Sequence, residues 1–244
     1  MTKKELFKQI QIIIPAGGSG LRFGENKLLC KINNVEVFIH TLRPFLDLFQ
    51  TNQIFIVVPK MELEIFKKLS DKYLKNSEIN FVVGGNTRAQ SVANGLYAGD
   101  SRKNFKYVII HDAARPLITT KVIEESLSAL VNFQNEFSGV VVAKKVVDTI
   151  KCVDDKGCFV KTLNRDSLWA METPQVFVRE KFKIAYDNIL SQNVDLALLT
   201  DDAAIMTESD FKVKPFDNES INCKITYRQD LELAEFLLRK KHGE

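Results

Sequence analysis

Short runs of apolar, mostly β-branched residues alternate along this chain with longer amphipathic segments. The apolar runs are residues 11–15, 54–58, 80–84, 107–111 and 139–143. The amphipathic segments between them are residues 37–48, 62–74, 88–98 and 122–133. Strands that are apolar on both faces are typical of a parallel sheet whose two sides are covered by helices. The pattern therefore predicts an α/β fold, and Pro44 predicts a kink or a break in the first helix.

The pattern changes after residue 143. Two alternating segments, residues 146–151 and 158–163, flank an Asp-Asp-Lys-Gly sequence whose composition favours a hairpin turn. A helix over 179–190, a strand over 212–216 and a helix over 230–241 complete the predicted elements. We expect a single domain, residues 1–244, with a projecting β-hairpin arm at about residues 145–170.

Charge and composition exclude several classes of protein. Lys and Arg number 34 and Asp and Glu 31, a net charge of +3 that gives no reason to expect nucleic-acid or membrane partners. The four cysteines are scattered without a CxxC motif and the three histidines are far apart, so neither a disulfide scaffold nor a structural zinc site is expected. The sequence has no signal-peptide pattern and no long apolar span, and we expect a cytoplasmic protein.

A glycine-rich segment follows the first predicted strand and reads PAGGSGLRFG, with Lys27 close behind it. Glycines let backbone N–H groups surround an anion, and Arg22 and Lys27 add positive charge. Phe23 stands where a dinucleotide fingerprint needs its third glycine, and the lysine signature of a P-loop is missing. The segment therefore indicates an anion-binding loop of another kind, with a flexible turn as the alternative.

Two further predicted strands end in polar sequences. One runs into GGNTRAQS, where Gly85 permits close backbone approach and Ser91 falls one turn into the next helix; by itself an ordinary strand-to-helix turn explains this sequence. The other ends in HDAARP, where Asp112 and Arg115 form either a structural ion pair or a metal ligand beside a phosphate-binding cation. His111 reads as a partly buried structural residue.

These three motifs, together with the later sequences LNRDSLW and TPQ, carry a family resemblance. The chain resembles the 2-C-methyl-D-erythritol 4-phosphate cytidylyltransferases from residue 12 to residue 238. The resemblance implies a Rossmann-like, mostly parallel sheet flanked by helices, of the nucleotide-diphospho-sugar transferase type. It also implies transfer of a cytidylyl group from CTP to the substrate's phosphate in non-mevalonate isoprenoid biosynthesis, with release of pyrophosphate. Mg²⁺ or another divalent cation would be the cofactor, and the arm would form a homodimer.

The resemblance also assigns roles to particular residues. The groups implied to act in catalysis are Arg22, Lys27, Arg165 and Lys224. The nucleotide would be bound by Pro15, Ala16, Gly17, Gly18, Gly20, Gly85, Asn86 and Ser91. The substrate would be bound by Arg115, Thr149, Thr173 and Thr200. Asp112 would bind the metal.

The chemistry agrees with this assignment, since a phosphate is already a nucleophile and needs only positioning and charge neutralisation. Gly17, Asn86 and Ala204 depart from the residues usual in the family, and the loop before Lys27 looks short, which makes Lys31 a possible substitute. A ribitol-5-phosphate cytidylyltransferase is the nearest alternative. A nucleotide-binding regulator without turnover and a nicotinamide oxidoreductase are alternatives from other classes.

Overall fold

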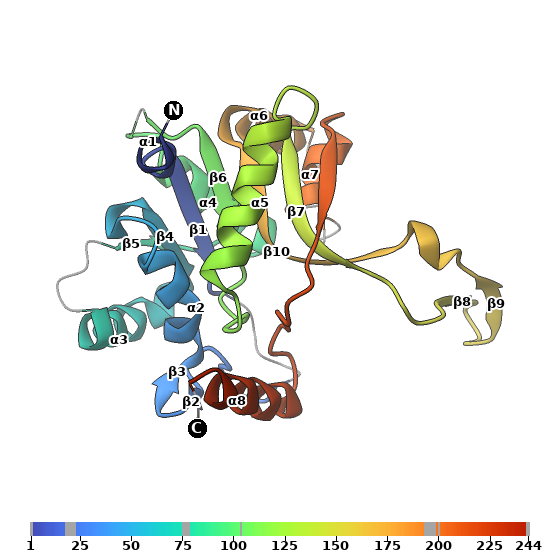
Figure 1. Cartoon of the computed structure of the whole chain (residues 1–244), viewed down its shortest axis with the longest axis horizontal. Helices are drawn as coiled ribbons and strands as arrows, with labels where there is room; N and C mark the ends of the chain where they lie inside the picture. Colours follow the sequence, from blue (N-terminus) through green and yellow to red (C-terminus); the bar gives the residue numbers. More distant parts are fainter. Residues whose placement is uncertain are drawn as a thin grey trace.

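A seven-stranded mixed sheet organises the part of the chain that the computed structural model describes, which is residues 2–17, 23–74, 79–102, 104–192, 199 and 201–242 (Figure 1). Its strands, in spatial order, are β11 (Val213–Asp217), β7 (Gly139–Lys145), β10 (Trp169–Val178), β6 (Tyr107–Ile110), β1 (Ile10–Pro15), β4 (Ile54–Val58) and β5 (Asn80–Val83). Strand β10 is antiparallel to both of its neighbours, and the other adjacent pairs are parallel. The predicted mostly parallel α/β sheet is confirmed.

Helices pack on both faces of the sheet. One apolar cluster unites the sheet with α1 (Lys3–Phe7), α2 (Val37–Leu46), α3 (Leu63–Leu74), α5 (Thr120–Phe133) and α8 (Arg228–His242). A second cluster, on the other face, unites it with α4 (Arg88–Ala98), α6 (Arg179–Ser191) and α7 (Asp202–Glu208). Strand β1 serves both clusters because side chains alternate along a strand: Ile12 and Ile14 join the first cluster and Ile13 joins the second. No helix in the described ranges is long and apolar enough to cross a membrane.

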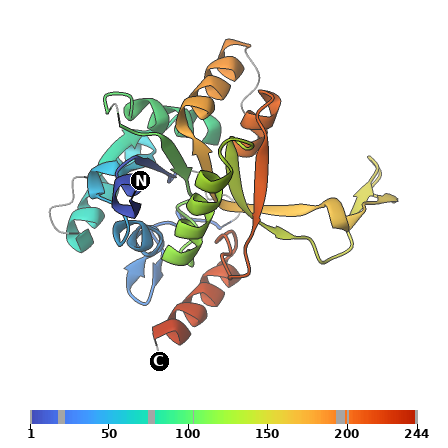
Figure 2. The ribbon, with the colours of Figure 1, turned by 45° about the horizontal axis from the view of Figure 1, so that its top comes forward.

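The arm follows β7 and returns to the sheet as β10. Its tip pairs β8 (Lys151–Val153) antiparallel to β9 (Phe159–Thr162), and Figures 1 and 2 show it extending away from the sheet. Asp154 Oδ1 shapes the turn by accepting the backbone N–H groups of Lys156 and Cys158 at 3.0 and 2.9 Å. Gly157 has a φ of +78°, a conformation that suits glycine. The predicted hairpin and its turn are confirmed.

Several predicted element bounds were wrong. Residues 146–150 are not a strand, although Val146 N–H still donates to Leu168 C=O at 3.1 Å across the two legs of the arm. Pro44 does not break α2, because it lies in the last turn and the helix continues to Leu46. Neither α1 nor α7 was predicted, since each is too short to show a helical period.

Strand β10 is the largest element that sequence reasoning missed. Its first four residues are exposed or half-buried and its next five are buried, so the period of two is absent. Its pairing with β7 shifts register between Met171 and Gln175, where Pro174 interrupts the ladder. A proline inside a run argues against a strand, and here the local irregularity hid a ten-residue one.

Between these elements, the described segments also contain three short 3₁₀ helices and a small hairpin. They are η1 (Thr51–Gln53), η2 (Lys60–Glu62), η3 (Arg165–Ser167) and the hairpin of β2 (Lys31–Ile32) with β3 (Val35–Glu36). Helix η3 lies in the arm, between β9 and β10. The β2–β3 hairpin follows the loop that carries Lys27, so that loop is anchored at both ends by strands.

Candidate active site

The carboxyl ends of β1, β4, β5 and β6 meet at one edge of the sheet, because these four strands are parallel. The chain passes from β1 to β4 and β5 on one side and then returns to place β6 on the other side of β1. Such a reversal is where open α/β sheets bind their ligands. The sequences that follow β1, β5 and β6, which carry the three polar motifs, therefore lie at this one edge of the sheet, which we call the crevice.

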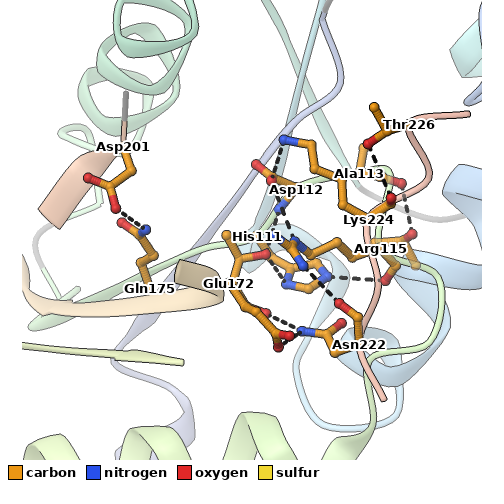
Figure 3. A network of polar contacts seen from close by, with 12 residues as sticks. His111, Asp112, Ala113, Arg115, Glu172, Gln175, Asp201, Asn222, Lys224 and Thr226 are labelled. Atoms are coloured by element: carbon orange, nitrogen blue, oxygen red, sulfur yellow. Dashed lines mark hydrogen bonds and ion pairs between the residues drawn. The ribbon is translucent and has the colours of Figure 1, made fainter. Parts of the chain in front are cut away.

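Asp112, two residues beyond β6, is the centre of a cluster of positive side chains (Figure 3). Its Oδ2 lies 2.8 Å from Lys224 Nζ and 3.6 Å from Arg115 Nε, and its Oδ1 lies 3.4 Å from Arg88 Nε. Burial opposes the ionisation of Asp112, but the charges of Arg88, Lys224 and Arg115 outweigh burial and hold its pKa well below the usual range. The site thus contains one fixed negative charge surrounded by three cations.

His111, next to Asp112 in the chain, is completely buried beside this cluster. The Thr173 hydroxyl lies 2.9 Å from His111 Nδ1 and accepts the Asp112 backbone N–H at 3.2 Å. These contacts are all satisfied if Thr173 donates to Nδ1 and the proton of the neutral ring sits on Nε2, which faces the Arg115 carbonyl at 3.4 Å. Burial lowers the pKa of His111 to about 3. His111 is therefore structural, as predicted, although it is fully rather than partly buried.

The loop after β11 brings Lys224 to Asp112. Ile225 N–H donates to the Ala114 carbonyl at 2.8 Å, and Arg115 Nη1 donates to the Asn222 carbonyl at 2.8 Å. Asn222 Nδ2 in turn donates to the Thr173 carbonyl at 2.7 Å. This loop is tied to β10 and to the segment after β6 by hydrogen bonds, so two other parts of the chain hold Lys224 near Asp112.

The turn between β5 and α4 is shaped by Ser91. Its hydroxyl accepts the Gly85 N–H at 3.1 Å and donates to the Thr87 carbonyl at 2.9 Å. The Asn86 N–H donates to Gln90 Oε1 at 2.9 Å, and a Cβ on Gly85 would overlap the Gln90 side chain. These residues form a rigid turn at the crevice, with the exposed Asn86 at its tip.

The structure brings together some of the residues assigned by resemblance and separates others. Asp112, Arg115, Thr173 and Lys224 form one cluster. The end of β1 lies beside it, since Ala113 N–H approaches the Pro15 carbonyl at 3.4 Å; Ala16 and Gly17 follow there, with Ala16 buried and Gly17 exposed.

Arg165 and Thr149 lie in the arm instead. Arg165 Nη1 donates to the Val147 carbonyl at 2.8 Å, and within the described part of this chain neither residue bonds to the Asp112 cluster. Lys27 is half-buried, beyond Gly24, whose φ is +87°. The assigned residues that lie outside the described ones are Gly18, Gly20, Arg22 and Thr200.

Sequence reasoning missed Arg88 and Asp202. Arg88 Nη1 lies 2.8 Å from Asp202 Oδ2, in an ion pair not aligned as a hydrogen bond, while Tyr186 donates its hydroxyl to Asp202 Oδ1 at 2.9 Å. A signal did exist: Arg88 is the first residue of α4, where the helix dipole disfavours a positive charge. An arginine in that position indicates a nearby carboxylate.

Asp112 could bind a divalent cation that takes only one ligand from the protein. Among the described residues no group of three or more His, Cys, Asp or Glu side chains could enclose a metal ion. Mg²⁺ in phosphate-transferring enzymes commonly uses one or two carboxylates and completes its shell with substrate phosphates and water. A single carboxylate at the crevice suits that mode of binding.

A mostly parallel sheet, a ligand crevice at its switch point and cations converging on one acid are the features of an α/β nucleotidyltransferase. Comparison with known proteins narrows this class to one family. Residues 10–240 match the family model of 2-C-methyl-D-erythritol 4-phosphate cytidylyltransferase, and the chain belongs to that family.

Individual relatives agree with the family match. The chain is 35% identical to the 2-C-methyl-D-erythritol 4-phosphate cytidylyltransferase of Prochlorococcus marinus (strain MIT 9515), over 94% of this chain and 99% of the relative. The Francisella tularensis enzyme of that name has a crystal structure similar to this fold, with a TM-score of 0.75, 32% identity, and coverage of 93% of this chain and 99% of that one. The structure of 4-diphosphocytidyl-2C-methyl-D-erythritol synthase from Anaerococcus prevotii gives a TM-score of 0.77 at 29% identity, covering 94% of this chain and 98% of that one.

Proposed function

We propose that this protein transfers a cytidylyl group from CTP to 2-C-methyl-D-erythritol 4-phosphate, giving 4-diphosphocytidyl-2-C-methyl-D-erythritol and pyrophosphate. The observation that carries this proposal is Asp112 with its three cations at the switch-point crevice, in a chain of this family. The relatives named above carry the erythritol name, which favours this acceptor over ribitol 5-phosphate. CTP is made in the cytoplasm, and we propose that compartment for the reaction.

The reaction needs no nucleophilic side chain. An oxygen of the acceptor's phosphate attacks the α-phosphorus of CTP and forms the new phosphorus–oxygen bond. The bond between the α-phosphorus and the α,β-bridging oxygen breaks, and its electron pair leaves with pyrophosphate. Because two anions must approach each other, the protein contributes by positioning them and by neutralising charge. His111, buried and neutral, fits this scheme as support rather than as an acid or base.

The cations divide between the two substrates in this proposal. Arg22 and Lys27, from the glycine-rich loop, neutralise the triphosphate as charge builds on it. Lys224 and Arg115 bind the phosphate of the acceptor, and their convergence on one side of the crevice supports that assignment. The backbone near Ala16 and the turn at Gly85 and Ser91 hold the cytidine.

Asp112 is the residue that would hold Mg²⁺ together with the oxygens of the triphosphate. When bound, the ion adds positive charge at the phosphates and helps to orient them. Asp112 Oδ1 has the more distant cation partner, Arg88 Nε at 3.4 Å, whereas Oδ2 has Lys224 Nζ at 2.8 Å. Lys224 stays available to the acceptor if the ion uses Oδ1.

We propose further that the arm forms a homodimer and carries Arg165 and Thr149 to the crevice of the partner subunit. Exposed apolar side chains along the arm support this proposal, among them Val147 at 76% and Phe159 at 75% exposure. The position of Arg165 and Thr149 in the arm, away from the Asp112 cluster of their own chain, supports it as well.

The decisive experiment is a pyrophosphate-release assay with CTP and Mg²⁺ in which the acceptor is varied. We expect turnover with 2-C-methyl-D-erythritol 4-phosphate and at least a hundredfold lower kcat/KM with ribitol 5-phosphate, because a site built for one hydroxyl pattern leaves polar groups unpaired with another. Mass spectrometry of the product identifies the nucleotide conjugate. Equal turnover with both acceptors contradicts the proposed specificity, and no turnover with either contradicts the proposed function.

A further inference from the structure

Arg88 connects the acid of the crevice to a second, completely buried carboxylate. Its Nε lies 3.4 Å from Asp112 Oδ1 and its Nη1 lies 2.8 Å from Asp202 Oδ2. The Asp202 side chain has 0% exposure, and its other oxygen accepts the hydroxyl of Tyr186 at 2.9 Å. Four elements thus meet here: the segment after β6, the start of α4, the start of α7 and the middle of α6.

This arrangement costs stability in two ways that a purely structural contact would avoid. A buried ion pair is costly to desolvate, and well-packed apolar residues often replace one without loss. Arg88 also places its positive charge in the first turn of α4, where the helix dipole disfavours it. Burial raises the pKa of Asp202, and the charge of Arg88 opposes that rise. The charge of Arg88 therefore helps to keep Asp202 ionised.

The contact between Arg88 and Asp112 offers a reason for keeping the Arg88–Asp202 ion pair, which is control of the rotation of the Asp112 carboxylate. The terminal torsion of an aspartate is broad, so its carboxylate can rotate unless its oxygens are held separately. Lys224 and Arg115 both approach Asp112 Oδ2, and among the ion pairs of the described residues Arg88 alone approaches Oδ1. A guanidinium is a planar fork that can bridge two carboxylates, which the ammonium of lysine does less well.

We propose that Arg88 is a positioning residue, held by Asp202, that fixes the orientation of the Asp112 carboxylate toward the crevice. The proposal rests on the proposed function, in which Asp112 holds the divalent cation. Asp202 and Tyr186 then act through Arg88 and never touch a substrate. The start of α7, which sequence reasoning missed, serves the site in this way.

The test uses Asp202→Asn and Arg88→Lys in the full-length protein. Asparagine keeps the shape of Asp202 and can still accept the Tyr186 hydroxyl, but it removes the charge that holds Arg88. We expect either variant to lower kcat and to weaken Mg²⁺-dependent CTP binding by about 10–100-fold, the usual effect of changing a residue that orients a metal ligand. CTP binding without Mg²⁺, measured by calorimetry in the absence of acceptor, should remain unchanged.

Asp100→Asn is the matched control, because Asp100 pairs with Arg179 at 2.6 Å near the other end of α4. This variant should lower the melting temperature but leave kcat and CTP binding as in the wild type. The double variant Asp112→Asn/Asp202→Asn adds a second control. If Asp202 acts through Asp112, the double variant should be no slower than Asp112→Asn alone, whereas a general structural defect would add to it.

The outcomes separate this inference from the proposed function. A folded Asp202→Asn or Arg88→Lys variant with wild-type kcat and wild-type Mg²⁺-dependent binding overturns the inference, and so does additivity in the double variant. If Asp112→Asn itself retains wild-type turnover, Asp112 is not the metal-binding acid and the inference fails, whereas the proposed transfer reaction stands. If Asp202→Asn does not fold, circular dichroism reveals it and the Arg88→Lys result decides.

Discussion

His111 and Asp112 are adjacent residues just beyond β6, and they are in opposite states of charge. The His111 ring is buried against Thr173 and remains neutral, whereas the Asp112 carboxylate faces Arg88, Arg115 and Lys224 and remains ionised. The surroundings of the two side chains produce this difference, because burial keeps the His111 ring neutral while three nearby cations keep the Asp112 carboxylate ionised. The buried residue can then orient its neighbour without exposure to substrate.

The buried ring makes stability depend on pH. The folded-state pKa of His111, about 3, lies below the unfolded value of about 6.5, so the unfolded chain binds more protons between these values and stability falls as pH falls through that window. From pH 8 to pH 5 this residue should remove about 2 kcal/mol from the free energy of unfolding. The Asp112 contribution is lost only at lower pH, because its pKa is lowered from 3.8.

Urea denaturation at several pH values measures this effect. We expect the His111→Gln variant to be less stable than the wild type at pH 8 and to lose about 2 kcal/mol less between pH 8 and pH 5. Parallel stability curves for the two proteins would show that His111 is protonated equally in the folded and unfolded states.

Alanine substitutions at Lys27 and Lys31 test which of the two lysines neutralises the triphosphate in the proposed reaction. Lys27 is half-buried in the loop before the β2–β3 hairpin, whereas Lys31 is exposed in β2. Removing one preorganised charge that acts in the transition state typically costs about 2.7–4 kcal/mol, or roughly a hundred- to a thousandfold in kcat. We expect Lys27→Ala to lose turnover on that order with a modest change in the KM for CTP, and Lys31→Ala to change little. The reverse result in steady-state kinetics would assign the role to Lys31.

At the scale of elements, helix α4 packs against the sheet with no room for a side chain at Gly95. Gly95 faces β1 and β4, and a Cβ at that position would lie 2.8 Å from Ile13 Cγ2 and 2.9 Å from Val57 Cγ2. Gln11, buried in β1, donates to the Gly95 carbonyl at 2.8 Å. This close packing sets the depth of α4 and hence the position of Arg88 at its start.

Gly95→Ala tests the close packing. Forcing a methyl group into a well-packed core costs about 1–3 kcal/mol, because the neighbours must shift. We expect chemical denaturation to show a loss of that size. Gly17→Ala is the control for stability, since no atom of the described residues lies within 4 Å of a Cβ built there. Unchanged stability in Gly95→Ala would indicate that α4 can move away from the sheet at little cost.

At the scale of the whole molecule, the arm stands apart because its exposed apolar side chains do not pack into the core. Its legs are joined by isolated hydrogen bonds, such as that from Leu163 N–H to the Ile150 carbonyl at 2.9 Å, and its apolar side chains point into solvent. Exposed apolar surface of this kind, rimmed by polar residues, marks an interaction site.

Phe159→Glu tests the proposed arm-mediated dimer. A carboxylate in an apolar interface is costly to desolvate, so the variant should sediment as a monomer and lose most of its activity while its circular dichroism spectrum is retained. Met61→Glu is the matched control, because Met61 is 98% exposed on η2 and lies outside the arm. Dimeric Phe159→Glu, or monomeric wild-type protein, would contradict the proposal.

Much of the fold could be predicted because each central strand is apolar along its length and each helix is amphipathic. Strand β4 and helix α4 have the predicted bounds, Ile54–Val58 and Arg88–Ala98. Strand β10 could not be predicted, since its irregular register removed the alternation on which a prediction depends. The HDAARP motif, which contains both Asp112 and Arg115, did indicate a charged site.

The sequence by itself determined the buried strands β1, β4, β6 and β7 and the motifs that follow the parallel strands, because apolar runs and glycine content are local properties. Only the tertiary structure decided which charges meet. Lys224 reaches Asp112 across 112 residues of chain, and Asp202 reaches Arg88 through the packing of α7 beside α6. Electrostatic partners depend on distance in space, and a carboxylate's surroundings are fixed only when the sheet has brought remote loops to one edge.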